Sequence, residues 1–364
     1  MDIAVIGGGH GCYAAAADLS EQGHSVRLWR RDGAALEPLK ARGGLVLKDF
    51  KGSRDVPLSM ITDDIAEAAH GAEVVLSPLP ATAQEGVAEA LAPHLVDGQI
   101  VFIPPGTFGS VVMARIVARA GNRSKVVFAE SGTLPYLARR HAPDTIAITT
   151  RATRLPTGVF PADASEPALA ALHRIYPAVE PLRDALDAAT MNAGPIIHPP
   201  LIVMNAGPLE SQERWDIHNE GTVPAIRAVT DKLDDERIAI REALGYGEPH
   251  FPLADHYDPS RPEWMYGNAA HERLTDSGDW REHIDLHHHR YMREDVSQGL
   301  CLLVSLAEWT RVKAPTAAGL LALASAVLDE DLRATGRSWE KLGLAEISRG
   351  GLRRLLDAGL PGAV

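Results

Sequence analysis

The sequence predicts an α/β protein in which an N-terminal Rossmann doubly wound sheet is followed by an all-helical domain. In the first half, short β-branched runs alternate with amphipathic helical patterns, as they do in parallel βαβ units. The first of these runs leads directly into a glycine-rich turn. Beyond about Asp184, strand patterns become scarce and helical patterns become longer. These three observations define the fold class.

The elements of the first half follow from hydrophobic periodicity and turn residues. Each predicted strand is a short apolar run: Asp2 to Ile6, Ser25 to Trp29, Glu73 to Leu76, Gln99 to Ile103 and Lys125 to Ala129. Helical patterns cover Tyr13 to Gln22 and Thr82 to Ala92. We expect Leu45 to Pro57 to form a small hairpin inserted in the sheet. Asp144 to Thr149 reads as one further strand, which leads into the Pro-rich segment Leu155 to Pro161.

The second half reads as helices. Pro224 to Leu244 places its apolar residues on one stripe and ends at glycines, and Val296 to Arg311 and Thr316 to Leu328 read the same way. Gly247 to Pro262 is rich in Pro, Asp and His and is predicted to be a surface loop. We therefore predict a dinucleotide-binding Rossmann domain over residues 1–184, a helical substrate and catalytic domain over 185–364, and a site between them.

Composition narrows the function class. The 364 residues suit two domains. The net charge of -12, without a long basic run, argues against nucleic-acid and membrane-surface partners. No apolar run approaches the ~20 residues that span a bilayer, and the N-terminus does not read as a signal segment. The only cysteines are Cys12 and Cys301, so we expect no disulfide framework, no metal site and a cytoplasmic location.

The strongest motif is the turn after the first strand, Gly7-Gly8-Gly9-His10-Gly11-Cys12, which opens a helix of alanines. In a dinucleotide fingerprint, the first glycine permits the tight turn and the second lets the backbone approach a pyrophosphate, which the helix N-terminus then faces. The predicted cofactor residues are Gly7, Gly9, His10, Gly11 and Cys12, with Pro104 at the nicotinamide end. Cys12 stands where the pattern has Gly or Ala, and His10 either touches phosphate or lies on the loop surface.

The end of the second strand bears on the choice of nicotinamide cofactor. An NAD enzyme usually places a carboxylate there for the ribose hydroxyls, whereas this chain has Arg30 and Arg31. A guanidinium suits a 2′-phosphate, so NADP is favoured, with NAD possible. The alternative is a solvated arginine pair with Asp32 on the ribose.

Two segments of the second half carry candidate chemistry. His198 lies in an apolar stretch, and Asp295 lies near a predicted helix start. An imidazole with a carboxylate partner exchanges protons near pH 7. The alternatives are a buried, hydrogen-bonded core histidine for His198 and an N-terminal helix cap or first-turn acid for Asp295. Asn205 is either a substrate ligand or a helix cap, and the tract His287 to His289 reads as a solvated cluster rather than a metal site.

These segments resemble the opine dehydrogenase family, which includes octopine and nopaline dehydrogenases and N-(1-carboxyethyl)norvaline dehydrogenase. The resemblance runs from end to end of the chain. Its motifs are the glycine turn with its alanine helix, Glu130 to Tyr136, Asn192 to Pro200, Glu220 to Pro224, and Arg290-Tyr291-Met292-Arg293-Glu294-Asp295-Val296. The resemblance implies that His198 and Asp295 form a catalytic dyad and that Arg290 holds the carboxylate of a keto acid.

The expected reaction is an NAD(P)H-dependent reductive condensation of an α-amino acid, or another amine, with an α-keto acid. The partners are then small molecules, and a homodimer is the default assembly. One rival is a ketone or keto-acid reductase of the glycerol-3-phosphate dehydrogenase or ketopantoate reductase type. Those enzymes use a lysine, and the helical half offers only Lys232, Lys313 and Lys341. The other rival is a non-catalytic NADP-binding sensor. The substrates' identities stay open, although Trp215, His218, Trp264 and Trp280 are expected to shape the pocket.

Overall fold

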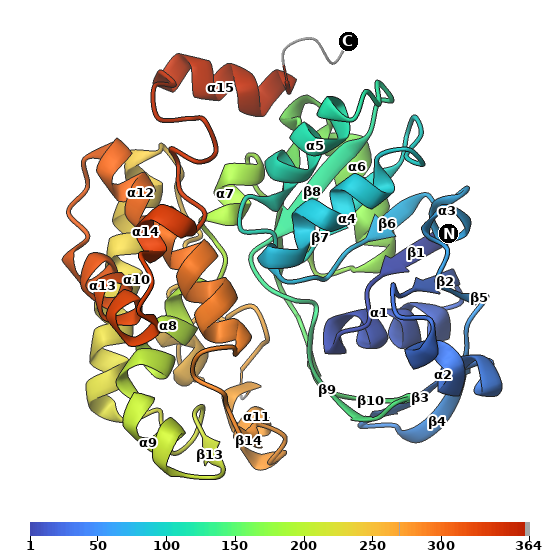
Figure 1. Cartoon of the computed structure of the whole chain (residues 1–364), viewed down its shortest axis with the longest axis horizontal. Coiled ribbons are helices and arrows are strands. Elements are labelled where there is room, and N and C mark those ends of the chain that lie inside the picture. The colour runs from blue at the N-terminus through green and yellow to red at the C-terminus, as the bar shows by residue number, and fades with distance from the viewer. Residues whose placement is uncertain (269, 361–364) are drawn as a thin grey trace. The chain divides into compact units, whose positions relative to one another are not determined.

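The computed structural model describes residues 1–268 and 270–360 (Figure 1). It contains two compact units. The first comprises Met1–Leu79, Ala83–Ala189 and, among the described residues, 352–360; the second comprises Pro80–Thr82 and Thr190–Gly351. The predicted boundary at 184/185 lies directly before helix α7 (Ala185–Ala189), which belongs to the first unit. The sequence gives no sign that the chain enters the second unit at Pro80 or returns to the first at Leu352.

The first unit is built on an eight-stranded sheet in the order β12-β11-β8-β7-β6-β1-β2-β5. Its strands are β1 (Asp2–Ile6), β2 (Ser25–Trp29), β5 (Met60–Thr62), β6 (Val74–Leu76), β7 (Ile100–Ile103), β8 (Val127–Ser131), β11 (Leu155–Phe160) and β12 (Val179–Pro181). From β5 to β8 the pairing is parallel, and the spatial order is the 3-2-1-4-5-6 of a Rossmann sheet. The five strands predicted from apolar runs correspond to β1, β2, β6, β7 and β8, so the doubly wound sheet is confirmed.

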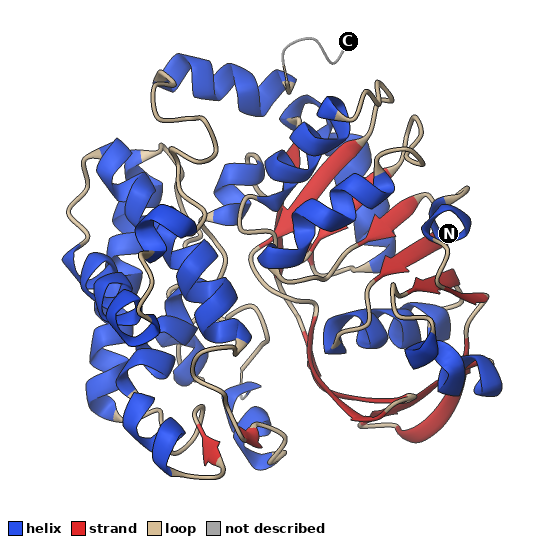
Figure 2. Cartoon of the chain, viewed as in Figure 1, coloured by secondary structure: helices blue, strands red, loops and turns tan. Residues whose placement is uncertain are grey.

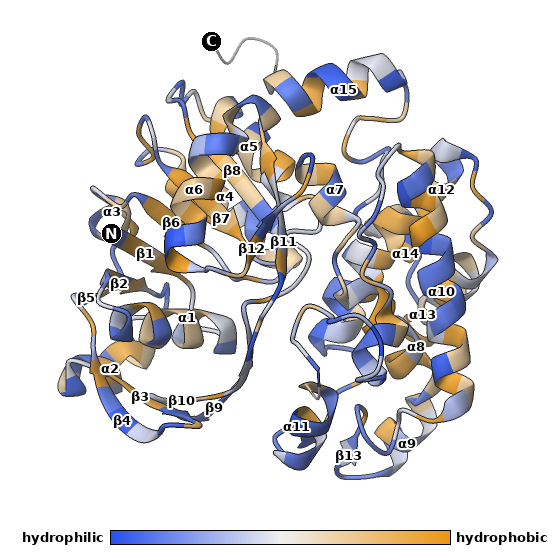
Figure 3. Cartoon of the chain, turned by 180° about the vertical axis from the view of Figure 1, so that it is seen from behind, coloured by the Kyte–Doolittle hydropathy of each residue, from blue (hydrophilic) through white to orange (hydrophobic). Residues whose placement is uncertain are grey.

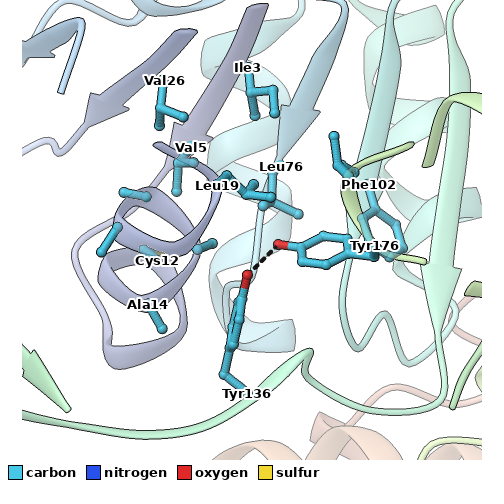
Figure 4. Packing of buried hydrophobic residues seen from close by; sticks show 14 of the residues in the cluster. Ile3, Val5, Cys12, Ala14, Leu19, Val26, Leu76, Phe102, Tyr136 and Tyr176 are labelled. Atoms are coloured by element: carbon cyan, nitrogen blue, oxygen red, sulfur yellow. Dashed lines mark hydrogen bonds between the residues drawn. The ribbon is translucent and has the colours of Figure 1, made fainter. Parts of the chain in front are cut away.

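Helices connect these strands (Figure 2). The α-helices of this unit are α1 (His10–Glu21), α2 (Glu37–Arg42), α3 (Ile65–Ala69), α4 (Gln84–Leu91), α5 (Gly109–Arg119), α6 (Ser165–Ile175) and α7, and the 3-10 turns are η1 (Ala34–Leu36), η2 (Ala81–Ala83, which begins in the second unit) and η3 (Ala162–Ala164). Strands β1, β6 and β7 carry mostly hydrophobic residues (Figure 3). The small residues Cys12 and Ala14 let α1 lie close to Val5 and Leu76 in the core (Figure 4).

A second sheet, in the order β4-β3-β10-β9, corrects one prediction. The hairpin of β3 (Gly44–Asp49) and β4 (Gly52–Pro57) is not inserted in the main sheet; it pairs with β10 (Thr145–Arg151), beside which lies β9 (Tyr136–Ala142). Arg151 of β10 links the hairpin to α1, because it donates to Asp49 on β3 and to buried Asp18 on α1, each at 2.8 Å; Asp18 also accepts from the Tyr136 hydroxyl at 3.0 Å. These partners are distant in sequence, so no local pattern reveals them.

Strands β5, β9, β11 and β12 were not predicted, whereas the strand expected over Asp144 to Thr149 is β10. The sequence of β9 contains adjacent arginines and a histidine instead of an alternating pattern, and β11 contains Pro156 and Gly158. Gly158 is needed there, because a Cβ would lie 2.0 Å from the carbonyl oxygen of Asp184, just before α7. Close packing of α7 on β11 therefore depends on a glycine that reads as a strand breaker.

The second unit is mainly helical. Its helices are α8 (Gly194–Met204), α9 (Ala206–Ser211), α10 (Pro224–Ala243), η4 (Leu253–Tyr257), α11 (Ala270–Asp276), η5 (Tyr291–Leu300), α12 (Cys301–Thr310), α13 (Pro315–Leu328) and α14 (Leu332–Thr335), and α15 (Arg349–Ala358) runs into the first unit. One short ladder, β13 (Trp215–Asp216) with β14 (Arg281–Glu282), departs from the all-helical prediction. No described helix has the length and apolar character that crossing a membrane requires.

The segment 247–262, predicted to be a surface loop, is partly a core element. It contains η4, whose Leu253 is buried, and Phe251 just before it is buried too. Asp234 on α10 accepts a hydrogen bond from the Leu253 amide at 2.7 Å. A buried carboxylate therefore holds this polar-looking segment in place, and polarity alone gave the wrong prediction.

The helix predicted over Val296 to Arg311 begins earlier and has two parts. Residues Tyr291–Leu300 form the π-helix η5, and α12 continues from it. π-Helical turns are rare in proteins, and those that do occur are often found at functional sites. Both acidic residues of the Glu294-Asp295 pair lie on η5 and are buried.

Candidate active site

The glycine turn of the first unit has the geometry of a dinucleotide site. Gly7 adopts φ +125°, a conformation that other residues rarely adopt, and a Cβ there would lie 2.4 Å from Leu79 and 2.8 Å from the Cys12 sulfur. The Cys12 thiol contacts the carbonyl oxygens of Ile6 and Pro78. The larger residue at position 12 is therefore accommodated, with Gly7 leaving it room.

The helix start that follows the turn is open to an anion such as a pyrophosphate. A Cβ on Gly9 would meet nothing within 4 Å, and no side chain caps the start of α1 at His10. A Cβ on Gly11, by contrast, would lie 3.1 Å from Leu134 and 3.4 Å from Pro78, so this glycine packs against the protein. The helix start offers amides and a positive dipole end to an anion. His10 is exposed, with Nδ1 3.4 Å from the carbonyl oxygen of Ala138.

Basic side chains gather beside this turn. Arg30 lies over Gly8, where a Cβ would come within 2.5 Å of its Cδ, and Arg30 Nη1 donates to the Tyr13 hydroxyl at 3.4 Å. Arg140 on β9 lies over the Tyr13 ring at 5.4 Å, and its Nη1 donates to the carbonyl oxygen of Gly8 at 3.5 Å. Sequence reasoning missed Arg140, because only the pairing of β9 brings it to the turn.

The other predicted residues at the strand end differ in their surroundings. Asp32, the carboxylate that the alternative assigns to the ribose, is largely exposed and lies 3.7 Å from Arg30 Nη2. Arg31 is exposed, and its guanidinium lies beside Gly86 on α4. Arg30 and Arg140, rather than Arg30 and Arg31, converge on the glycine turn.

The loop that begins at Pro104 is held rigidly by buried polar groups. Pro104 follows β7 and is buried. Glu130 on β8 accepts hydrogen bonds from the amides of Phe108 at 3.0 Å and Ser110 at 3.1 Å, and Gln84 Nε2 donates to the carbonyl oxygen of Gly106 at 2.9 Å. In this structure, Glu130 of the Glu130 to Tyr136 motif therefore supports a loop and the start of α5.

In the second unit, His198 on α8 meets Asp295 on η5, 97 positions away in the sequence. The His198 Nδ1 atom lies 2.7 Å from Asp295 Oδ2, and the two side chains are only 12% and 7% exposed. This contact fixes which ring nitrogen faces the carboxylate, as in an acid–base dyad. The two residues singled out in the sequence are thus brought together.

Two glycines bring the helices close enough for this contact. A Cβ on Gly194, at the start of α8, would lie 2.2 Å from Asp295 Oδ1, and a Cβ on Gly299 of η5 would lie 2.1 Å from Pro195. α8 continues through Pro199 and Pro200, which lack the amide hydrogens that would bond the preceding turn. The motif around His198 thus specifies a tightly packed, irregular helix.

Burial sets the proton affinity of the acidic residues. It raises the pKa of the Asp295 carboxyl to about 7, against the opposing effect of the Arg290 charge. Burial, followed by the neighbouring Asp295 charge, raises the pKa of Glu294 to about 7 as well. The pKa of the Asp295 carboxyl is thereby raised toward the pH range in which proton-transfer groups act.

Arg290 presents a cationic group beside the dyad. Its side chain is 45% exposed, and Nη1 lies 3.7 Å from Glu294 Oε2. Its guanidinium also lies 5.3 Å from the centre of the Tyr291 ring. An arginine that is supported on one side and open on the other suits a carboxylate ligand.

Asn205 is surrounded by protein groups. Its Nδ2 donates to the carbonyl oxygens of Leu201 at 2.8 Å and Gly221 at 3.2 Å, and its Oδ1 accepts from Trp215 Nε1 at 3.2 Å. This geometry favours the capping alternative over substrate binding. In the histidine tract, His288 Nδ1 lies 2.9 Å from Asp285, and the described residues include no group of three or more side chains suited to a metal ion.

Glu294 yields a prediction on stability. Because its folded-state pKa of about 7 exceeds the ordinary value, the protonated carboxyl stabilises the fold at acidic pH, and this stabilisation is lost as pH rises through about 7. Glu294→Gln retains the oxygen that accepts from the Ala81 amide at 3.0 Å but has no charge to bury. We expect the variant to be more stable than the wild type by about 2 kcal/mol at pH 8.5 and equally stable near pH 4.5.

Urea unfolding at both pH values measures this difference. Exposed Glu346, changed to Gln, serves as the control and should leave stability unchanged at either pH. Equal stability of Glu294→Gln and wild type at pH 8.5 would show that Glu294 is not buried as a charge.

Comparisons with known proteins agree with the two-unit division. Residues 181–328 match the family model for the alpha-helical domain of NAD/NADP octopine/nopaline dehydrogenases, which spans both His198 and Asp295. Residues 2–104 match the N-terminal domain of NAD-dependent glycerol-3-phosphate dehydrogenase. An opine dehydrogenase of Arthrobacter sp. (strain 1C) is 27% identical over 361 residues, which cover 97% of this chain and 98% of that protein.

Solved structures share the fold of the whole chain. Octopine dehydrogenase, determined with NADH and L-arginine, superposes with a TM-score of 0.70 at 18% identity and covers 98% of both chains. Yersinopine dehydrogenase, determined with NADP⁺, superposes with a TM-score of 0.66 at 16% identity and covers 99% of this chain and 98% of that one. The resemblance to the opine dehydrogenases and the Rossmann-plus-helical fold are thereby confirmed.

Proposed function

We infer that this chain, which is related to the opine dehydrogenases along nearly its whole length, is an NAD(P)H-dependent oxidoreductase that condenses an amine with an α-keto acid and reduces the resulting imine. The observation that carries the proposal is the contact of 2.7 Å between His198 and Asp295, within the segment that matches the opine dehydrogenase helical domain. A secondary amine dicarboxylic acid is the product expected from an α-amino acid substrate.

The residues of the second unit supply binding and proton transfer. Arg290 holds a substrate carboxylate by charge-assisted hydrogen bonds. His198, oriented by Asp295, donates the proton that lets the carbinolamine hydroxyl leave as water, which gives the imine. When an amine nitrogen must lose a proton first, the same imidazole accepts it. Asp295 stabilises the charged imidazole through its contact with Nδ1.

The cofactor supplies the hydride that reduces the imine carbon. Gly7, Gly9 and the start of α1 fit its pyrophosphate, as the open space at Gly9 indicates. Transfer requires the hydride donor within ~3–3.5 Å of the imine carbon. Water must also be kept from the reacting carbon, and the burial of the dyad is consistent with that need.

NADP is the proposed cofactor, although NAD remains compatible with the fold. Arg30 and Arg140 both lie at the glycine turn, and converging guanidinium groups suit a 2′-phosphate. We expect Arg140→Ala to raise KM for NADPH about 10-fold while leaving KM for NADH within about 2-fold, since a lost charge-assisted bond costs ~1.4 kcal/mol or more.

Steady-state kinetics with both cofactors test this assignment, with exposed Arg123 changed to Ala as the matched control. An equal rise of KM for NADPH and NADH would mean that Arg140 contacts a part that the two cofactors share. A cytoplasmic homodimer is proposed as well, since both cysteines are free and buried and symmetric dimers are the commonest assemblies.

The keto-acid reductase alternative is less well supported. The glycerol-3-phosphate dehydrogenase match ends at residue 104, before the helical unit. In that unit Lys232 is exposed on α10 and bonds Asp235 at 3.0 Å, and Lys341 donates to the carbonyl oxygen of Thr335 at 2.8 Å. A sensor without catalysis has no need for a buried carboxyl, Asp295, whose pKa is raised to about 7 beside a histidine.

A matrix of amines against pyruvate, glyoxylate and 2-oxoglutarate, followed by NADPH absorbance, tests the function. We expect oxidation of NADPH only when both an amine and a keto acid are present. Oxidation with a keto acid alone would support the reductase alternative, and no oxidation with any pair would support the sensor.

A further inference from the structure

The tyrosine next to Arg290 packs flat against the dyad histidine. The centres of the Tyr291 and His198 rings are 3.6 Å apart, and the ring planes differ by 12°. Tyr291 is 1% exposed, so this stack lies inside the second unit. In the sequence, Tyr291 was noted only as part of the motif that begins at Arg290. The structure shows that its ring contacts His198 directly.

The Tyr291 ring is itself held in place by other groups. Its hydroxyl lies 2.8 Å from Nε2 of His218, a residue that is 7% exposed. The His218 amide in turn donates to Asp216 at 3.0 Å. On another side, the His289 ring approaches Tyr291 edge-on with the centres 4.4 Å apart, and His289 Nδ1 accepts from the Tyr291 amide at 3.3 Å. The Tyr291 ring, whose face packs on His198, is therefore held in one orientation.

We propose that Tyr291, held by His218, is a positioning residue that keeps the His198 imidazole aligned with Asp295 and favours its protonated form. The proposal rests on the proposed function, in which His198 transfers a proton. The stack limits rotation of the imidazole about its side-chain bond, while the contact with Asp295 fixes Nδ1. Together they leave Nε2 as the nitrogen that serves the substrate.

The preference for the protonated form follows from the aromatic face. The face of an aromatic ring carries negative partial charge and attracts a cation that lies on it. A flat imidazolium stacked at 3.6 Å is such a cation. Removing the ring should therefore lower the pKa of His198, by about half a unit to one unit if the typical strength of this attraction applies.

Other charged groups also act on this histidine. From η5, Asp295 favours the imidazolium, as does Glu294 when ionised, whereas Arg290 opposes it and also lies over the Tyr291 ring at 5.3 Å. α13 packs against α8 and contains no titratable residue. α10 also packs against α8, and its buried charged side chains, Asp234, Arg237 and Arg241, bond to one another or to Thr190 and His250.

The pKa of His198, measured by NMR on protein with ¹³C-labelled histidine, tests the proposal without any substrate. His198→Asn identifies the signal. Tyr291→Leu removes the stack, and we expect it to lower the pKa of His198 by about 0.5–1 unit and kcat about 10-fold. Tyr291→Phe keeps the ring and should recover at least half of both losses, which a general folding defect would not allow.

His218→Leu examines the second part of the arrangement. We expect it to lower kcat at least as much as Tyr291→Phe does, since the His218 ring also meets the His198 ring edge-on with the centres 5.9 Å apart. The double variant should be no worse than His218→Leu alone, because both changes remove the same hydrogen bond. Tyr246→Leu, which removes another buried tyrosine of the second unit, is the control and should leave the pKa of His198 unchanged.

An unchanged or raised pKa of His198 in folded Tyr291→Leu would overturn the proposal, as would losses in the double variant that simply add. The NMR readout separates this inference from the proposed function: a lowered pKa in a protein without condensing activity would support the positioning role and reject the reaction.

Discussion

Replacing His198 with asparagine is expected to lower kcat about 10²–10⁴-fold, the range that general acid–base catalysis contributes. Asparagine is close in size and still bonds Asp295, but it cannot take up and release a proton near pH 7. The loss should be in kcat rather than in substrate KM, because Arg290, the proposed carboxylate ligand, is unchanged. The amine-dependent oxidation of NADPH at saturating substrates measures it.

The same variant should keep its cofactor site. The glycine turn lies in the first unit and His198 in the second, so the Kd of NADPH should change less than about 2-fold. Turnover that equals the wild type would remove His198 from the mechanism. A parallel loss of NADPH binding would mean that the variant is misfolded or that His198 serves the cofactor.

Gly194→Ala is expected to lower kcat about 100-fold. Its Cβ would lie 2.2 Å from Asp295 Oδ1, so the carboxylate or the start of α8 must move by about an ångström. Misplacing a catalytic group by that distance costs roughly 10²-fold. Kinetics on purified variants, with circular dichroism to verify the fold, measure the effect.

Gly207→Ala is the matched control. Gly207 is exposed on α9, and a Cβ there would meet nothing within 4 Å, so activity should stay within about 2-fold of the wild type. If Gly194→Ala behaves like Gly207→Ala, the close approach of α8 and η5 is not needed for the dyad's geometry.

Local signals in the sequence were enough for the Rossmann sheet. The predicted strands Asp2 to Ile6 and Ser25 to Trp29 coincide with β1 and β2, because buried parallel strands are continuous apolar runs. The glycine turn is likewise local, since a strand, a tight turn and a helix start follow one another directly. Features of this kind need no knowledge of distant contacts.

Features that depend on distant contacts were missed. The polar strand β9 pairs with β10, and Tyr136 on β9 and Arg151 on β10 both bond Asp18, which is far from them in the chain. Arg140 reaches the glycine turn through the same strand. No periodicity encodes such pairings, so Arg140 could not be found beside Arg30.

The candidate site contains some residues that the sequence identified and others that only the structure reveals. His198 and Asp295 were proposed from a family resemblance, and the structure brings them to 2.7 Å. Gly194 and Gly299, which make that distance possible, are ordinary glycines in the sequence and acquire meaning only from the packing of α8 on η5. The sequence left Asn205 as either a substrate ligand or a helix cap. The structure favours the cap, because the amide is engaged by Leu201, Gly221 and Trp215.

The most direct test of the proposed reaction follows the hydride itself. Nicotinamide cofactor deuterated at the transferring position is incubated with the enzyme, an amine and a keto acid, and the products are identified by mass spectrometry. We predict a secondary amine with one deuterium on the former keto carbon, formed by the wild type and not by His198→Asn. A deuterated 2-hydroxy acid, formed equally well without the amine, would contradict the condensation.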